Sequence, residues 1–230
     1  MLHKVLYVYN AIWYWDVREH ACRVFLDTLS ASGAGPACAT PAKFVELLIT
    51  GLRQDICPRN IALCTEHLRA IPEVVMRVSA LAAYVKSDGA VGPVSCKGGV
   101  TVLLNVLRRC GHDAAVCEHA CAALLSLAPH GNNRAFINKS RGIPAVLGVF
   151  VKHPSAKPAL SAAIDLLAII VQDFPNHQTN FRTHNGPALL KAALTAGLEP
   201  RSKSTAQSIQ RLCAPQRRSE RQRKLARARG

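Results

Sequence analysis

The sequence predicts an all-α protein built from a helical motif that recurs along the chain. Three segments that each begin with glycine resemble one another, namely 99–107, 142–150 and 186–194. Their glycines are 43 and 44 residues apart, and apolar residues follow at helical spacing, such as Leu103 and Leu107. Composition agrees, because 49% of the residues are hydrophobic but only 5% are aromatic, which favours small aliphatic cores between closely packed helices.

The rest of the motif recurs with the glycines. Long helices rich in alanine are predicted over 79–85, 119–128 and 162–171, and a short segment at 132–137 is echoed at 176–181. The predicted order within one unit is a short helix, a glycine turn, a second helix, a loop and a long helix. One such unit cannot bury its apolar face alone, so successive units must stack.

One unit carries Asn-Arg, an Ile four residues after the Asn, then Gly, an apolar residue, Pro and a Leu-rich helix. These residues are Asn133, Arg134, Ile137, Gly142, Ile143, Pro144 and Leu147. The pattern resembles the armadillo repeat, and the match is good over 74–200. The resemblance implies a right-handed α-solenoid. Each glycine is expected to supply a left-handed helix end, and Pro144 and Pro187 suit the first turn of a helix.

Three parts of the chain are predicted. Residues 1–42 are expected to form N-terminal helices or a cap, followed by a loop rich in Gly and Pro. Residues 43–214 are expected to form the armadillo-type array. Residues 215–230 are basic and are expected to be a disordered tail or a solvated helix.

The ends of the predicted array are less regular than its middle. Residues 43–52 read as the second helix of an earlier unit. Residues 58–70 and 72–86 both read as helices, so that unit carries an extra helix or an insertion. Residues 202–212 are expected to form the last long helix, with Leu212 on its apolar face.

The resemblance also implies where a partner would bind. In armadillo proteins the long third helices line a concave groove, and in nuclear-import receptors two positions on each such helix hold Trp and Asn, which grip basic peptides. Those positions are occupied here by Ser79, Ala83, Ala122, Ser126, Asp165 and Ile169. None is Trp or Asn, so recognition of a nuclear-localisation peptide in that way is not expected. A surface made of small and nearly uncharged residues favours an apolar or helical segment of a protein partner. Helix packing or contact with solvent alone explains the same residues equally well.

The net charge of +15 is concentrated near the C-terminus, where residues 201–230 hold ten basic residues and one acidic residue. The basic residues of the tail are Arg217, Arg218, Arg221, Arg223, Lys224, Arg227 and Arg229. The tail has three interpretations: a solvated segment, a nuclear-localisation or nucleic-acid patch, or a contact for acidic partners or anionic membranes. It lacks aromatic residues, so base stacking is not expected there.

No catalytic or metal-binding motif stands out. The chain has no Gly-Lys-Ser/Thr phosphate loop and no Gly-x-Ser-x-Gly elbow. Three cysteines and two histidines fall within 110–121, but Cys117 and Cys121 share an apolar helical stripe with Leu124. Buried thiols are therefore predicted in place of a zinc site, which needs four converging ligands. The histidines at 153, 177 and 184 are expected to be solvated.

The function predicted from the sequence is that of a non-enzymatic protein–protein interaction scaffold without cofactor or metal. The alternative is a nucleic-acid-associated helical-repeat protein that uses the basic tail. An odd number of cysteines, nine, and the lack of a signal peptide predict an intracellular, cytoplasmic protein, with the nucleus as the alternative that the tail offers. No uninterrupted apolar run approaches about 18 residues, so no membrane span is expected.

Overall fold

The computed structural model describes residues 45, 48–53, 56, 70–86, 91–195 and 197–214. In these residues the regular structure is entirely helical, which confirms the predicted all-α class. The expectations for 1–42, for most of 58–70 and for 215–230 lie outside the described residues. The helices are α5 (Ala70–Val85), α6 (Val91–Cys96), α7 (Gly99–Arg109), α8 (Ala114–Leu127), α9 (Asn133–Lys139), α10 (Gly142–Lys152), α11 (Lys157–Val171), α12 (Pro175–Thr183), α13 (Gly186–Thr195) and α14 (Pro200–Leu212).

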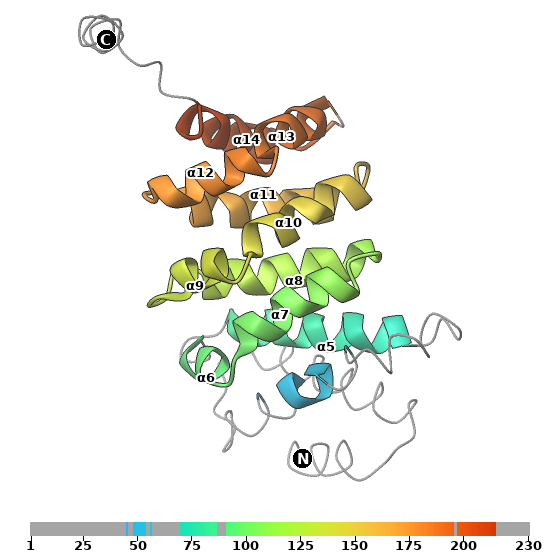
Figure 1. Ribbon diagram of the computed structural model, residues 1–230. Coiled ribbons are helices and arrows are strands. Elements are labelled where there is room, and N and C mark those ends of the chain that lie inside the picture. Colours follow the sequence, from blue (N-terminus) through green and yellow to red (C-terminus); the bar gives the residue numbers. More distant parts are fainter. Residues whose placement is uncertain are drawn as a thin grey trace, which may run out of the picture.

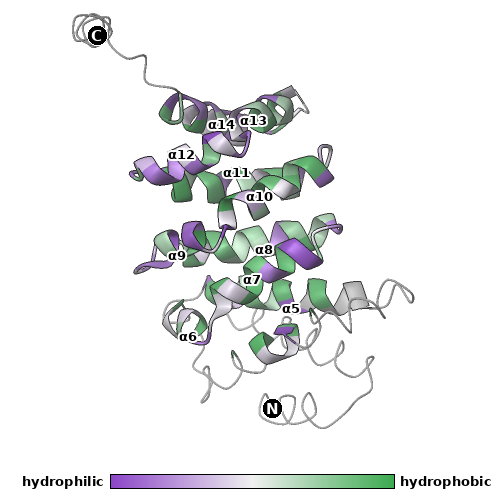
Figure 2. Ribbon diagram, viewed as in Figure 1, coloured by the Kyte–Doolittle hydropathy of each residue, from purple (hydrophilic) through white to green (hydrophobic). Residues whose placement is uncertain are grey.

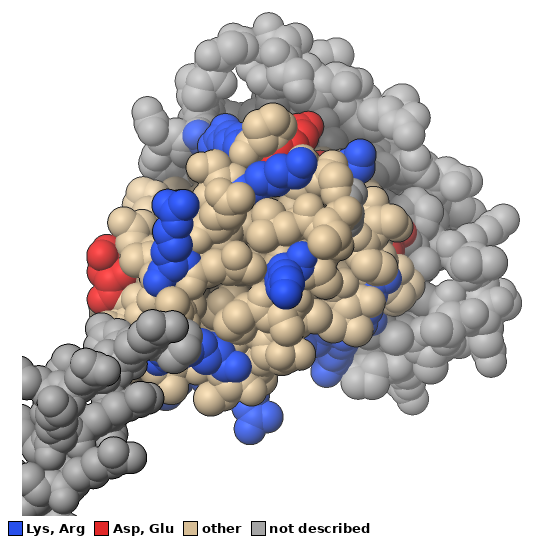
Figure 3. Space-filling model, turned by 90° about the horizontal axis from the view of Figure 1, so that it is seen from above, with Lys and Arg blue, Asp and Glu red and all other residues tan. Residues whose placement is uncertain are grey.

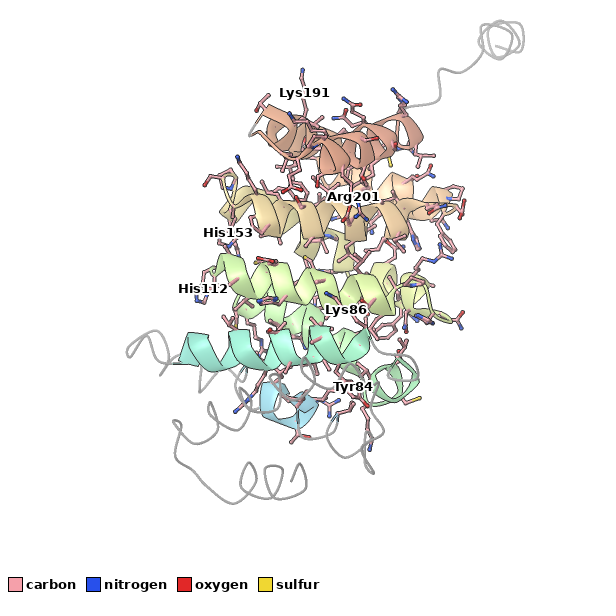
Figure 4. The ribbon with its side chains drawn as sticks, turned by 180° about the vertical axis from the view of Figure 1, so that it is seen from behind. Tyr84, Lys86, His112, His153, Lys191 and Arg201 are labelled. Atoms are coloured by element: carbon pink, nitrogen blue, oxygen red, sulfur yellow. The ribbon has the colours of Figure 1, made fainter. Side chains whose placement is uncertain are left out.

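After α5 the helices form three successive layers of three helices each (Figure 1). The long helices α5, α8, α11 and α14 pack against one another in that order, and α7, α10 and α13 form a second row. We call the surface of the first row the long-helix side, and the surface of α6, α7, α9, α10, α12 and α13 the short-helix side. Figure 1 looks onto the short-helix side, and Figure 4 is turned to show the long-helix side.

The backbone takes the same conformation at each of the three glycine turns. The residue before the glycine is left-handed in every layer, with φ of 78° at Gly98, 55° at Arg141 and 60° at Asn185. Its N–H donates to the carbonyl three residues earlier, at 3.1 Å in all three turns. The expected role of the glycine therefore needs correction, because the left-handed position is the one before it.

The glycine is required for space. A Cβ atom on Gly142 would lie 2.4 Å from Cγ2 of Ile137 and 2.6 Å from the Ile137 carbonyl oxygen. A Cβ on Gly99 or on Gly186 would meet an apolar side chain at 2.4 Å or 2.3 Å. Each contact comes from the residue five positions before the glycine. These residues are Val94, Ile137 and Phe181.

The apolar stripe of the long helices ends at α14. Matching backbone hydrogen bonds, Leu160 N–H to Ala156 O at 3.0 Å and Lys203 N–H to Glu199 O at 2.9 Å, align α11 with α14. Four buried residues of α11 then correspond to residues of α14, or just after its end, that are exposed or half-exposed. The pairs are Leu160 and Lys203, Ile164 and Gln207, Leu167 and Gln210, and Val171 and Ala214.

The second row ends in the same way, because buried Leu147 of α10 corresponds to exposed Lys191 of α13. Seen from this end, the surface carries many more Lys and Arg side chains than acidic ones (Figure 3). A polar outer face is what a terminal, water-facing layer needs. The prediction that Leu212 lies on the apolar face of α14 was wrong. Its side chain is 51% exposed, while Ala206 and Ile209 form the buried face of this helix.

Candidate protein-binding surface

The six residues predicted to line a groove lie on three neighbouring long helices. Ser79 and Ala83 are on α5, Ala122 and Ser126 on α8, and Asp165 and Ile169 on α11. All of them are exposed or half-buried, and their helices pack side by side along the long-helix side (Figure 4). Ser126 Oγ donates to the Ala122 carbonyl at 3.3 Å, which turns this hydroxyl back onto its own helix.

The same surface extends onto α14, which the sequence analysis did not include. Positions 43 residues after Asp165 and Ile169 hold Ser208 and Leu212, and both are exposed. The signal that would have found them is the repeat spacing itself. Ile169 packs partly on the core and Leu212 is 51% exposed, so the surface becomes more apolar towards α14.

Asp165 is the charged group in this row. Its side chain is half-buried on α11 and forms no ion pair or hydrogen bond with another described residue. At neighbouring positions of the row, Ala122 and Ile169 are small or apolar. This arrangement suits binding, and a single carboxylate would orient a partner that carries one positive charge.

The cysteines near the start of α8 are buried. Cys110, Cys117 and Cys121 are all buried, and the Cys117 thiol donates to the Gly111 carbonyl at 3.6 Å. Burial raises the pKa of Cys117 to about 11 and also raises the pKa of Cys121. Within the described part of the chain, no three His, Cys, Asp or Glu side chains converge as a metal site would require.

Two histidines that the sequence analysis assigned to solvent are structural. His177 is 5% exposed, and its Nδ1 donates to the Ile170 carbonyl at 2.7 Å at the end of α11. Its ring stacks on Phe174 with centroids 4.6 Å apart. His153 is half-buried, and its Nε2 donates to the Gly111 carbonyl of the preceding layer at 3.0 Å. Both rings satisfy carbonyl groups that helix ends and loops leave without partners, whereas His184 is exposed as predicted.

Polar side chains join adjacent layers on both sides. Asn133 of α9 donates from Nδ2 to the Leu127 carbonyl at 2.8 Å and to Ser95 Oγ at 3.0 Å. Asn180 Nδ2 donates to Asn138 Oδ1 at 2.7 Å. On the long-helix side, the hydroxyls of Ser202 and Ser161 are 3.0 Å apart. Such links join each layer to the next and help to hold successive layers in register.

Comparisons of this chain with protein-family models, with curated proteins and with solved structures find no match. The described helices were also compared with the requirements of a membrane span, and none combines the necessary length and apolar character.

Proposed function

We propose that the chain is a non-enzymatic, intracellular scaffold of armadillo-type repeats that binds a protein partner on its long-helix side. The proposal that the layers form a right-handed solenoid rests on the recurring turn at Gly98, Arg141 and Asn185 and on the regular packing of the long helices. In such an array one surface of the third helices is free for a ligand.

One observation carries the binding proposal. At corresponding positions the long helices expose Ala83, Ser126, Ile169 and Leu212, a row of small or apolar side chains that crosses all four of them. Small side chains leave room for an inserted element, and Ile169 with Leu212 offers an apolar contact at one end. An amphipathic helix or an extended apolar segment is the partner that fits such a row.

The test places two bulky charges in the row. In the variant Ala122→Arg with Ser126→Arg, both changes lie on half-exposed positions of α8. The matched control, Thr101→Arg with Ala135→Arg, adds the same charge at exposed positions of the short-helix side. Both variants should keep the helical circular dichroism and melting temperature of the parent chain.

Affinity purification of the parent and both variants would be quantified by mass spectrometry. We expect a protein recovered with the parent and with the control to be lost with the α8 variant. If every protein recovered with the parent is recovered equally with the folded α8 variant, the long-helix side is not the binding surface.

The alternative function, nucleic-acid association through the tail, is supported by the seven basic residues after Pro215. Deleting 215–230 should then abolish nucleic-acid binding and its strong salt dependence. Binding of a protein partner that survives this deletion would favour the scaffold.

A further inference from the structure

In the described structure the acidic residues are confined to the long helices and the loops beside them, whereas basic residues occur on both sides. The segments 91–109, 133–152 and 175–195 contain the helices of the short-helix side, and they hold nine Lys or Arg residues and no Asp or Glu. All six acidic residues of the described part lie on long helices or in the loops beside them. The nine cations are Lys97, Arg108, Arg109, Arg134, Lys139, Arg141, Lys152, Arg182 and Lys191.

Most of these cations are available to a ligand. Seven of the nine are exposed, and only Arg134 and Arg182 are half-buried. Lys139, Arg141 and Lys191 form no hydrogen bond or ion pair with the residues that the structure describes. Among the described residues their charge has no fixed partner, and solvent ions that balance such a charge are released when a polyanion binds.

Around the turn between α9 and α10 the cations lie close together. Arg108 of α7 donates to Asn105 Oδ1 at 3.0 Å and to the Ser140 carbonyl, which brings it next to Arg141. Burial and the charge of Arg141 lower the pKa of Arg108. Lys139 ends α9 beside the same turn, and α7, α9 and α10 hold no acidic residue.

An exposed aromatic ring accompanies these charges. Phe136 of α9 is 43% exposed, although a phenylalanine of this size is normally buried. It lies between Arg134 and Lys139 on the same short helix. In Figure 2, α9 and α12 are the most hydrophilic helices of this side, so Phe136 stands on a polar surface.

We infer that the short-helix side binds the sugar–phosphate backbone of a single-stranded nucleic acid, with Phe136 as a stacking platform for one base. Cations spread over three layers match a chain of phosphates, and an aromatic ring among them matches a base. This surface is separate from both the proposed protein-binding row and the tail, so the inference does not rest on either.

The observations favour nucleic acid over an acidic protein. A protein interface needs apolar anchors at its centre. Among described residues this side exposes only two large hydrophobic side chains, Phe136 and Val151. Cations without fixed partners are, in contrast, what sequence-independent phosphate contacts use.

The test uses the full chain and two triple variants with equal loss of charge. The first, Lys139→Gln with Arg141→Asn and Lys152→Gln, removes three exposed cations from the short-helix side. Asn suits position 141 because Asn185 holds the equivalent left-handed backbone. The control, Lys157→Gln with Arg201→Gln and Lys203→Gln, removes three exposed cations from the long helices α11 and α14.

Binding of a fluorescently labelled oligouridylate would be followed by anisotropy over a range of salt concentrations. The first variant should reduce the slope of log affinity against log salt by about 2, since each phosphate contact on a single strand contributes about 0.7. The control should keep the parent slope. Phe136→Ala should weaken binding by about fivefold or more without changing the slope.

Three outcomes would overturn the inference. Equal loss of slope in both triple variants would show an effect of net charge alone. An unchanged slope in the first variant would assign the binding to the tail. Polyglutamate that binds more tightly than the oligouridylate and loses affinity only in the first variant would assign the surface to an acidic protein.

Discussion

The glycine at the start of α10 provides a sharp test of how the layers are built. In Gly142→Ala, the new methyl carbon would lie 2.4 Å from Cγ2 of Ile137 and 2.6 Å from the Ile137 carbonyl oxygen. A side chain can rotate away, but a backbone carbonyl can move only together with the helix that carries it. The methyl group should therefore push α9 and α10 apart.

The same helix offers a matched control. Gly148 lies in the middle of α10, and a Cβ atom there would meet nothing within 4 Å. Gly148→Ala should therefore stabilise the protein by about 0.5–1 kcal/mol, the usual gain for alanine over glycine within a helix. Overpacking of a tight contact costs about 1–3 kcal/mol, so we expect Gly142→Ala to be destabilising by up to about 2.5 kcal/mol after the same helix gain.

Urea unfolding of the full chain, followed by circular dichroism, measures both variants. The free energies of unfolding should differ by about 2 kcal/mol, which for a chain of this size corresponds to a difference of about 4–8 °C in melting temperature. If Gly142→Ala is as stable as Gly148→Ala, the close approach of α9 to α10 is not what requires glycine.

Three further predictions follow from other contacts. The Asp113 carboxylate caps α8 by accepting hydrogen bonds from the N–H groups of residues 115 and 116 at 2.8 Å and 3.0 Å. Asp113→Ala should lower the free energy of unfolding by about 1 kcal/mol and speed amide hydrogen exchange at both N–H groups. Asp113→Asn should leave both quantities nearly unchanged. His177→Ala should cost about 1–3 kcal/mol by leaving a buried carbonyl without a donor, and His177→Asn should recover much of the urea midpoint, since Asn133 makes the equivalent bond in the layer before. Cys117 should resist N-ethylmaleimide at neutral pH while exposed Cys96 reacts, as mass spectrometry can show. The raised pKa also means that the folded chain holds this proton more tightly than the unfolded chain, so the free energy of unfolding should fall as pH rises from the ordinary value of 9.0 towards about 11; a rise would contradict the burial of the thiol.

The regular parts of the fold could be predicted from the sequence because local and long-range signals agree there. In α10 and α11 the glycine, the nearby proline and the apolar spacing all indicate the same helices. Helix α6 was not identified, because Gly92 and Pro93 within six residues weaken every helical signal. Its formation depends on packing against α7 and α8, which residue patterns do not report.

The side chains were harder to predict than the helices. The roles of His153 and His177 depend on carbonyl groups 42 and 7 residues away. No local sequence pattern indicates such a hydrogen-bond partner. The position of the left-handed residue was missed for a related reason: glycine is the usual choice for that backbone conformation, yet Arg141 and Asn185 adopt it while the following glycine relieves a steric contact.

The uneven distribution of the acidic residues was hidden for a different reason. Total charge and the basic tail dominate the composition, so the absence of acidic residues from three separate segments becomes visible only when those segments are seen to share one surface. The candidate row on the long helices, in contrast, was predicted from the resemblance to armadillo proteins together with the repeat spacing.

The packing of each long helix mainly on its immediate neighbours has a mechanical consequence. Since α8 rests on α5 and α11, and α11 on α8 and α14, a slight pivot at each junction adds to the next along the stack. The stack should therefore bend gradually along its length, with the strain shared among the junctions between successive long helices. A ligand lying across α8, α11 and α14 would adjust this curvature to its own shape.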